Sequence, residues 1–196
     1  MNETVRLVGV LTCIAIIVGL LVSLAESITR EPIRAAKIAA EQAAAREVLP
    51  MSEAEPEGLD FVAASGATNR LFRAGGAVAV RVAVQGYGGP VSLLVGFTED
   101  GRLFNYGVLE HQETPGLGAR IGDASFRTGV TKNADGESRP VDTTNWKVRK
   151  DGGDIDAIAG ATISSRAVCA AVQAAAAIRS EYLSSPSISS GAANEN

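Results

Sequence analysis

The sequence predicts an α+β fold: a single N-terminal transmembrane helix, followed by a mostly antiparallel sheet with packed helices. Three patterns carry this prediction: an uncharged apolar run over residues 7–25, alternating apolar positions over 78–85, and apolar positions at helical spacing over 164–183. Strand and helix patterns do not alternate along the chain as repeated βαβ units would. This argues against a parallel α/β sheet.

The apolar run has the length of a membrane span. As a helix, residues 7–25 would extend roughly 28 Å, close to the ~30 Å hydrocarbon core of a bilayer. We therefore expect residues 1–28 to anchor the chain in the lipid bilayer. A cleaved signal peptide is the alternative, but its apolar region is usually shorter, and Leu24-Ala25-Glu26 is a poor cleavage site.

The charges that flank the run give a weak signal for its orientation. Arg6 precedes it, whereas Arg30, Arg34 and Lys37 follow it. The positive-inside rule alone therefore points weakly towards a C-terminal side in the cytoplasm.

Residues 29–50 predict a helical stalk. Thr29 is a candidate N-cap, Pro32 suits a first turn, and Pro50 ends a segment rich in strong helix formers. A first helix packed on the following domain fits the same pattern.

The domain is expected over residues 51–183. Residues 51–60 are acidic and loop-like, and Val78 to Val84 alternates as a strand with one apolar face. Further strands are expected over 91–97 and 102–109, because turn residues stand at 86–90 and 99–101.

The sequence near the end of the domain predicts one more hairpin and a long helix. The hairpin is expected over residues 147–158, around Gly152-Gly153. The helix over 164–183 has one narrow apolar face, and the polar tail over 184–196 is expected to be disordered.

Composition excludes several functions. The chain has 196 residues and a formal net charge of −4, so we expect no nucleic-acid partner. Cys13 and Cys169 cannot build a disulfide framework, and the single histidine, His111, excludes a histidine-rich metal site, so no metal is expected. A hydrolase also lacks support, because no Gly-x-Ser-x-Gly elbow accompanies that histidine.

One short segment combines a hydroxyl with the expected start of the last helix. Thr162 follows two small residues, Gly160 and Ala161, and Ser164 or Ser165 could cap the helix. The N-terminus of a helix attracts anions, so a phosphate held on Thr162 would be stabilised there. A glycine turn with a serine cap and no ligand explains the same residues.

Three ordered blocks resemble the FMN-binding domain family. Residues 159–168, Ala-Gly-Ala-Thr-Ile-Ser-Ser-Arg-Ala-Val, resemble its flavinylation motif, Ser/Thr-Gly-Ala-Thr-Ser/Thr. Residues 111–118, His-Gln-Glu-Thr-Pro-Gly-Leu-Gly, are similar to its His-x-Glu-Thr-Pro-Gly-Leu-Gly loop. The turn at 86–90 is similar to a third family block, and the resemblance extends over about residues 5–183.

This resemblance implies covalently bound FMN, attached by a phosphoester to Thr162, without a catalytic residue of the chain's own. The upstream part of the flavinylation motif would be Asp156 and Ala159, although the family usually has Ser or Thr at the latter position. The cofactor-binding residues implied by the motif context are Glu113, Thr114, Gly116, Leu117, Lys147, Gly160, Ala161 and Ser164. We expect Lys147 to place positive charge near the flavin.

A second Ser-Gly-Ala-Thr sequence occurs at residues 65–68. Its letters match the motif better than those at Thr162, but Val62 stands where Asp156 stands for the other site. No alanine-rich helical pattern follows Thr68 either. We therefore expect attachment at Thr162.

The family includes the G subunit of the Rnf ion-translocating electron-transport complex and the C subunit of the sodium-pumping NADH:quinone reductase. The resemblance favours an Rnf-type G subunit, a redox carrier linking ferredoxin and NAD, with a flavin transferase needed for maturation and other membrane subunits as partners. It implies a bacterial inner-membrane protein with the FMN domain on the periplasmic side, against the weak charge signal. The quinone-reductase subunit, or a membrane-anchored binding module without redox chemistry, is the alternative.

Overall fold

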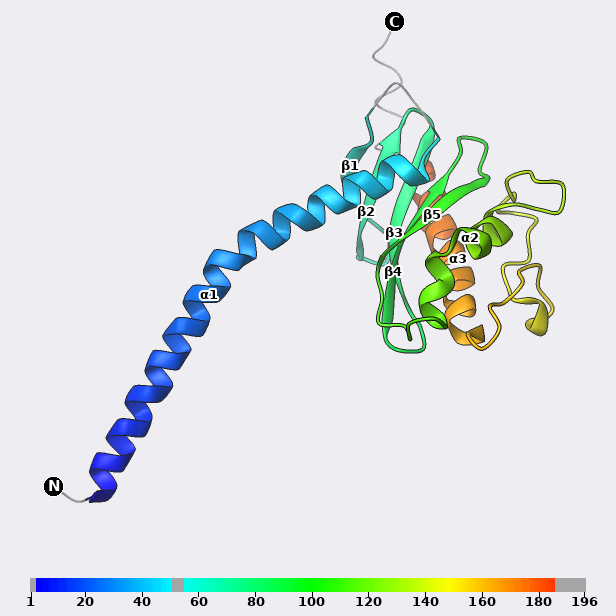
Figure 1. Cartoon of the computed structure of the whole chain (residues 1–196). Coiled ribbons are helices and arrows are strands. Elements are labelled where there is room, and N and C mark those ends of the chain that lie inside the picture. The colour runs from blue at the N-terminus through cyan, green and yellow to red at the C-terminus, as the bar shows by residue number, and fades with distance from the viewer. Residues whose placement is uncertain (1–2, 51–54, 186–196) are drawn as a thin grey trace, which may run out of the picture. The chain divides into compact units, whose positions relative to one another are not determined.

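The computed structural model describes residues 3–50 and 55–185, and confirms the α+β class (Figure 1). The beginning of the expected acidic loop and nearly all of the expected disordered tail lie outside these residues. The chain forms two compact units, residues 1–40 and 41–196. The predicted boundaries between anchor, stalk and domain stay predictions.

One long helix, α1 (Glu3–Val48), contains both the apolar run and the expected stalk. Its apolar part is long and apolar enough to cross a membrane. The expected helix start at Thr29 is wrong, because the hydroxyl of Thr29 donates to the Ala25 carbonyl inside a continuous helix that also includes Pro32.

The second unit is built on an antiparallel meander of five strands in the order β1-β2-β3-β4-β5. The strands β3 (Ala77–Gln85), β4 (Pro90–Phe97) and β5 (Leu103–Glu110) confirm the sequence prediction. The structure also contains β1 (Glu57–Val62) and β2 (Thr68–Ala74), which the sequence does not predict. The loop expected over 51–60 is therefore wrong from Glu57 onward.

Both faces of the sheet are covered. Val78, Val80 and Val82 of β3 pack into the main core with α3 (Thr162–Ser184). The opposite face, which includes Ala79, packs against the last residues of α1, where Val48 is fully buried. In Figure 1, α3 lies behind the strands and the end of α1 lies in front of them.

The connection from β5 to α3 contains the 3-10 helix η1 (Gly118–Gly122), the helix α2 (Ala124–Thr131) and the short 3-10 helix η2 (Arg149–Asp151). The hairpin expected over 147–158 is wrong. Val148 instead forms an isolated parallel bridge with Ile155, because the intervening residues turn through η2.

Helix α3 confirms the predicted apolar face. Val168, Val172 and Ala175 are fully buried in the main core. The packing of this face on the sheet holds the first turn of α3 beside the loops that end β3 and β5, where the candidate site lies.

Candidate functional site

A cavity of about 350 Å³ lies where three segments meet: the turn at 86–90, the loop at 111–118 and the first turn of α3. Seven residues predicted from sequence line it: Glu113, Thr114, Leu117, Gly160, Ala161, Thr162 and Ser164. The remaining lining residues are Tyr87, Gly118 and Ile163. The volume is within the range of small-molecule sites.

The turn that starts α3 depends on Gly160. Its φ angle of +77° is rarely adopted by residues with a side chain, and the turn is closed by the amide of Ala161, which donates to the Ile158 carbonyl at 3.0 Å. Ala161 is the N-cap and makes no side-chain capping bond. The helix therefore begins with amides that no side chain caps.

The expected serine caps are wrong, because α3 begins two residues before Ser164. The Ser165 hydroxyl accepts from the Ile158 amide and donates to the Ala161 carbonyl, each at 3.0 Å. The Ser164 hydroxyl instead donates to the carboxylate of Glu113.

Thr162 is the first residue of α3 and is half-buried at the cavity wall. Gly160 and Ala161 line the cavity beside Thr162, and as small residues they leave room next to its side chain. A phosphate esterified there would lie at the positive end of the helix dipole.

Glu113 connects the three segments of the site. It is 4% exposed, and its carboxylate accepts from the amides of Tyr87 at 2.8 Å and Gly88 at 3.0 Å, as well as from Ser164. Burial raises the pKa of this carboxyl, but the hydrogen bonds and the nearby His111 outweigh that effect, so the pKa lies below its ordinary value. The group is therefore an anion at neutral pH.

Gly118 makes room for this arrangement. A Cβ atom at this position would lie only 2.6 Å from the Ser164 hydroxyl oxygen and would also collide with the Glu113 carboxylate. The second glycine of the Thr-Pro-Gly-Leu-Gly loop is thus required by close packing against α3.

The mouth of the cavity is apolar. Tyr87, Leu117 and Ile163 are 69%, 46% and 45% exposed, and exposed apolar side chains grouped at a cavity are typical of a binding site. Sequence reasoning implied Leu117 as a cofactor-binding residue and the turn at 86–90, which contains Tyr87, as part of the family resemblance. It missed Ile163, whose position in the first turn of α3 beside Thr162 was the available signal.

Four predicted residues do not line the cavity. Gly116 lies in the exposed loop between Thr114 and Leu117, and Ala159 is exposed just before the turn into α3. Asp156 is an exposed partner of Arg149 at 2.5 Å. Lys147 is also exposed and lies in a bend, not in the strand that the sequence suggested.

Three further residues, His111, Trp146 and Thr68, have structural roles or lie outside the cavity lining. His111 accepts from the Glu113 amide at 3.2 Å and so helps to hold the loop at 111–118. Trp146 is buried and donates to the Val141 carbonyl at 3.0 Å, so it belongs to the core. Thr68, the rejected attachment residue, is exposed at the first position of β2.

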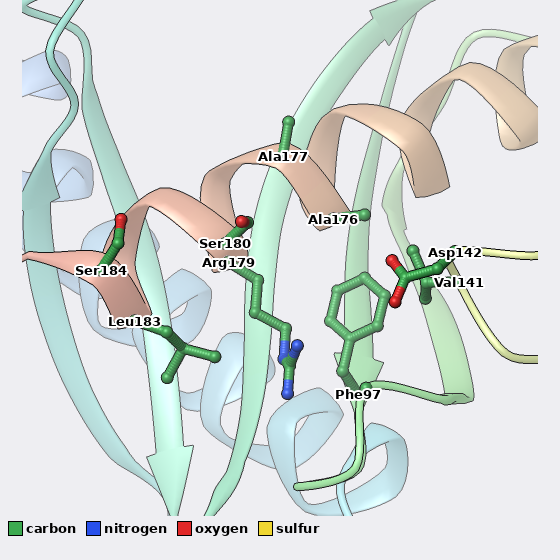
Figure 2. Close-up of a pocket in the computed structure, with 10 residues that line it drawn as sticks. Phe97, Val141, Asp142, Ala176, Ala177, Arg179, Ser180, Leu183 and Ser184 are labelled. Carbon is green, nitrogen blue, oxygen red and sulfur yellow. The ribbon is translucent and has the colours of Figure 1, made fainter.

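A second cavity, of about 590 Å³, lies near the C-terminal end of α3. Figure 2 shows Arg179 extending from the helix towards Phe97. Its guanidinium donates to the carbonyls of Thr98 and Glu99 at 3.2 and 2.9 Å, so it stabilises the turn between β4 and β5. None of the predicted site residues lines this cavity.

Comparison with known proteins points to the first cavity. Residues 86–177 match the family described as "FMN-binding domain". This stretch contains every residue that lines the cavity, including the loop at 111–118 and the start of α3. The resemblance to this family inferred from the motifs is confirmed.

The chain is also similar to curated proteins that are named as the G subunit of an ion-translocating oxidoreductase complex. It is 43% identical over 94 residues to the one from Vibrio atlanticus, covering 48% of this chain and 44% of the relative. For the Pseudomonas aeruginosa UCBPP-PA14 protein the identity is 47% over 95 residues, covering 47% and 43%. For the Escherichia coli K12 protein it is 42% over 99 residues, covering 50% and 48%. The matched stretch spans less than half the length of these relatives.

Proposed function

We propose, from the match of residues 86–177 to the FMN-binding domain family, that this chain carries FMN esterified to Thr162. It passes electrons as the G subunit of an ion-translocating oxidoreductase complex, as its named relatives suggest. The observation that carries the proposal is the position of Thr162, which is the first residue of α3 and lies in the wall of the 350 Å³ cavity.

The residues present suit this cofactor. The uncapped amides at the start of α3 suit a phosphate on Thr162, and the apolar mouth suits a flat aromatic ring. Leu117 and Tyr87 are placed to contact such a ring and to exclude water from it. The exposed side chain of Thr114 is available for its polar edge, whereas the Thr114 carbonyl already accepts from the amides of Leu117 and Ala119.

When bound, FMN supplies reversible transfer of one or two electrons. The protein's part is to hold the phosphate, orient the ring and keep the cofactor at one copy per chain. No nucleophile of the chain takes part in this chemistry.

Maturation requires access to the attachment motif. Asp156 and Ala159 are both exposed, so a flavin transferase can reach the segment before Thr162. Since Ala159 stands where the family usually has a hydroxyl, we expect attachment to proceed, at a lower rate if the transferase contacts that hydroxyl.

The apolar part of α1 would anchor the chain in the bacterial inner membrane through residues 7–25. We place the FMN domain on the periplasmic side, and other membrane subunits of the complex are its partners. The C subunit of a sodium-pumping NADH:quinone reductase is the second candidate, because it would use the same attachment chemistry.

The test is covalent flavin in the full chain, coexpressed with a flavin transferase. Thr162→Ala should abolish flavin fluorescence in a denaturing gel, whereas Thr68→Ala should retain it at the wild-type level. Tryptic cleavage after Lys150 and Arg166 should release a peptide heavier by one FMN less one water.

Thr162→Ser is the matched control, since it keeps the hydroxyl and should retain some label. Fluorescence that survives in Thr162→Ala would refute the assignment. A wild-type chain that is colourless after coexpression would favour a binding module without redox chemistry.

A further inference from the structure

The cavity at Thr162 contains one formal charge, and that charge is negative. Among the described residues that line it, Glu113 alone carries a charged side chain at neutral pH. Lys147, which the sequence suggested as a positive neighbour, is exposed and is not part of the lining.

The charge of Glu113 is held in place by neutral partners. Its carboxylate accepts from the amides of Tyr87 and Gly88 and from the hydroxyl of Ser164, and these donors come from two different segments. Hydrogen bonds of this kind fix the position of an anion without cancelling its net charge. His111, on the exposed side of the same loop, is the titratable group that acts on Glu113 through its charge.

Fixed charge at this place acts on electron transfer. Reduction brings two electrons and one proton to the isoalloxazine, so the cofactor becomes one unit more negative. A buried anion nearby raises the free energy of that reduced form, and it does so more strongly than an exposed one because water screens it less.

We propose that Glu113 lowers the reduction potential of FMN held on Thr162 and so makes the flavin a stronger electron donor. The proposal rests on the proposed function, since it requires FMN at this cavity. Glu113 acts through its charge, and the hydrogen bonds to Tyr87, Gly88 and Ser164 keep that charge at a constant position.

The test is Glu113→Gln in the flavin-loaded full chain. The glutamine oxygen can accept from both amides and its NH₂ group can donate to Ser164, so the variant removes the charge and keeps the hydrogen-bonding pattern. In a redox titration with dithionite at pH 8, the midpoint potential should rise by at least about 30 mV. That shift is a tenfold change in the two-electron equilibrium constant.

Asp135→Asn is the matched control, because it removes the same charge at an exposed turn outside the cavity lining. Its midpoint potential should equal that of the wild type. Ser164→Ala removes one hydrogen bond but keeps the carboxylate, so its shift should be less than half of that in Glu113→Gln.

Three results would overturn the proposal. The first is an unchanged or lowered potential in Glu113→Gln. The second is a folded Glu113→Gln chain that takes up no flavin, because the carboxylate would then serve attachment and not the potential. The third is a Glu113→Gln chain that is unfolded by circular dichroism, because the charge of Glu113 would then serve folding and not the potential. Absence of covalent flavin in the wild type would instead refute the proposed function.

Discussion

At the scale of single residues, local context distinguishes two nearly identical motifs. Thr68 belongs to a sequence that matches the letters of the flavinylation motif better, but it lies exposed at the start of β2. Thr162 starts a long helix and lines a cavity. A phosphate on a hydroxyl at a helix N-terminus can accept from several free backbone amides at once. A residue at the exposed start of a strand has no such group of amides beside it.

Glu113 also makes the stability of the fold depend on pH. Since its folded pKa lies below the ordinary value of 4.5, its contribution to stability is present above the unfolded pKa and is lost as the pH falls through the folded pKa. Glu113→Gln lacks this contribution. In flavin-free chain at pH 7 it should unfold about 1 kcal/mol more easily than the wild type, because its hydrogen bonds are kept but no longer involve a charged acceptor, and neutral hydrogen bonds are weaker by about that amount.

The measurement is thermal unfolding of both chains between pH 7 and pH 3. The difference in melting temperature should be constant down to about pH 5 and should shrink below pH 4.5. A difference that does not change with pH would contradict the role of the ionised carboxylate.

At the scale of elements, the last turns of α1 belong to the domain. Ala45 and Val48 are fully buried against the sheet, and Glu41 pairs with Arg81 of β3 at 2.6 Å. The carbonyl of Glu47 also accepts from the side-chain amide of Asn105 at 3.2 Å. The sequence left a free stalk and a packed helix as equal alternatives, and these contacts favour packing for the segment from Glu41 onward.

Truncation tests this element. A chain that starts at residue 41 should fold and remain soluble, because it keeps every contact of the second unit. A chain that starts at residue 50 loses Val48 and Leu49 from the core and should be destabilised by roughly 3–6 kcal/mol, from the burial of two such side chains.

Val48→Ala in the chain that starts at residue 41 is the finer variant. It removes two buried methyl groups and should cost about 1.6 kcal/mol in chemical denaturation. If the chains that start at residues 41 and 50 were equally stable, the segment 41–49 would contribute nothing to the core.

The same two-sided packing explains why β2 was missed. Leu71 and Phe72 are adjacent and both buried, one in the core beneath α3 and the other in the core beneath α1. A strand that is covered on both faces loses the alternation by which a one-sided strand is recognised. The strand could have been predicted only if it had been known that the end of α1 packs on the second face of the sheet.

At the scale of the whole molecule, the proposed orientation in the membrane can be tested by thiol labelling. Ala134 is exposed in the second unit, and its replacement by Cys provides a reporter for that side. Native Cys169 should remain unlabelled, because burial raises the pKa of its thiol to about 11. If the FMN domain is periplasmic, a membrane-impermeant maleimide should label Ala134→Cys in intact cells.

Glu3→Cys is the control for the other side of the apolar run. It should react only after the cells are permeabilised, and Cys13, within the run, should react slowly in both cases. Labelling of Glu3→Cys but not Ala134→Cys in intact cells would support the flanking charges and reverse the proposed topology.

Local patterns were sufficient for the features that depend on neighbours in the chain. An uncharged run long enough to span a bilayer, an alternating strand over 78–85 and a helical apolar face over 164–183 are all present in the sequence, and the structure contains the corresponding helices and strand. The glycine turn before Thr162 is equally local, because it needs a positive φ at one residue, Gly160, and glycine adopts such an angle readily.

Tertiary packing decided the features that join distant segments. It brought Glu113 to Ser164, fifty-one positions later, and left Lys147 outside the cavity. It also joined the end of α1 to the open face of the sheet. Periodicity reports which side of an element is apolar but does not report which other element covers it, so the charge inside the cavity became visible only in the folded chain.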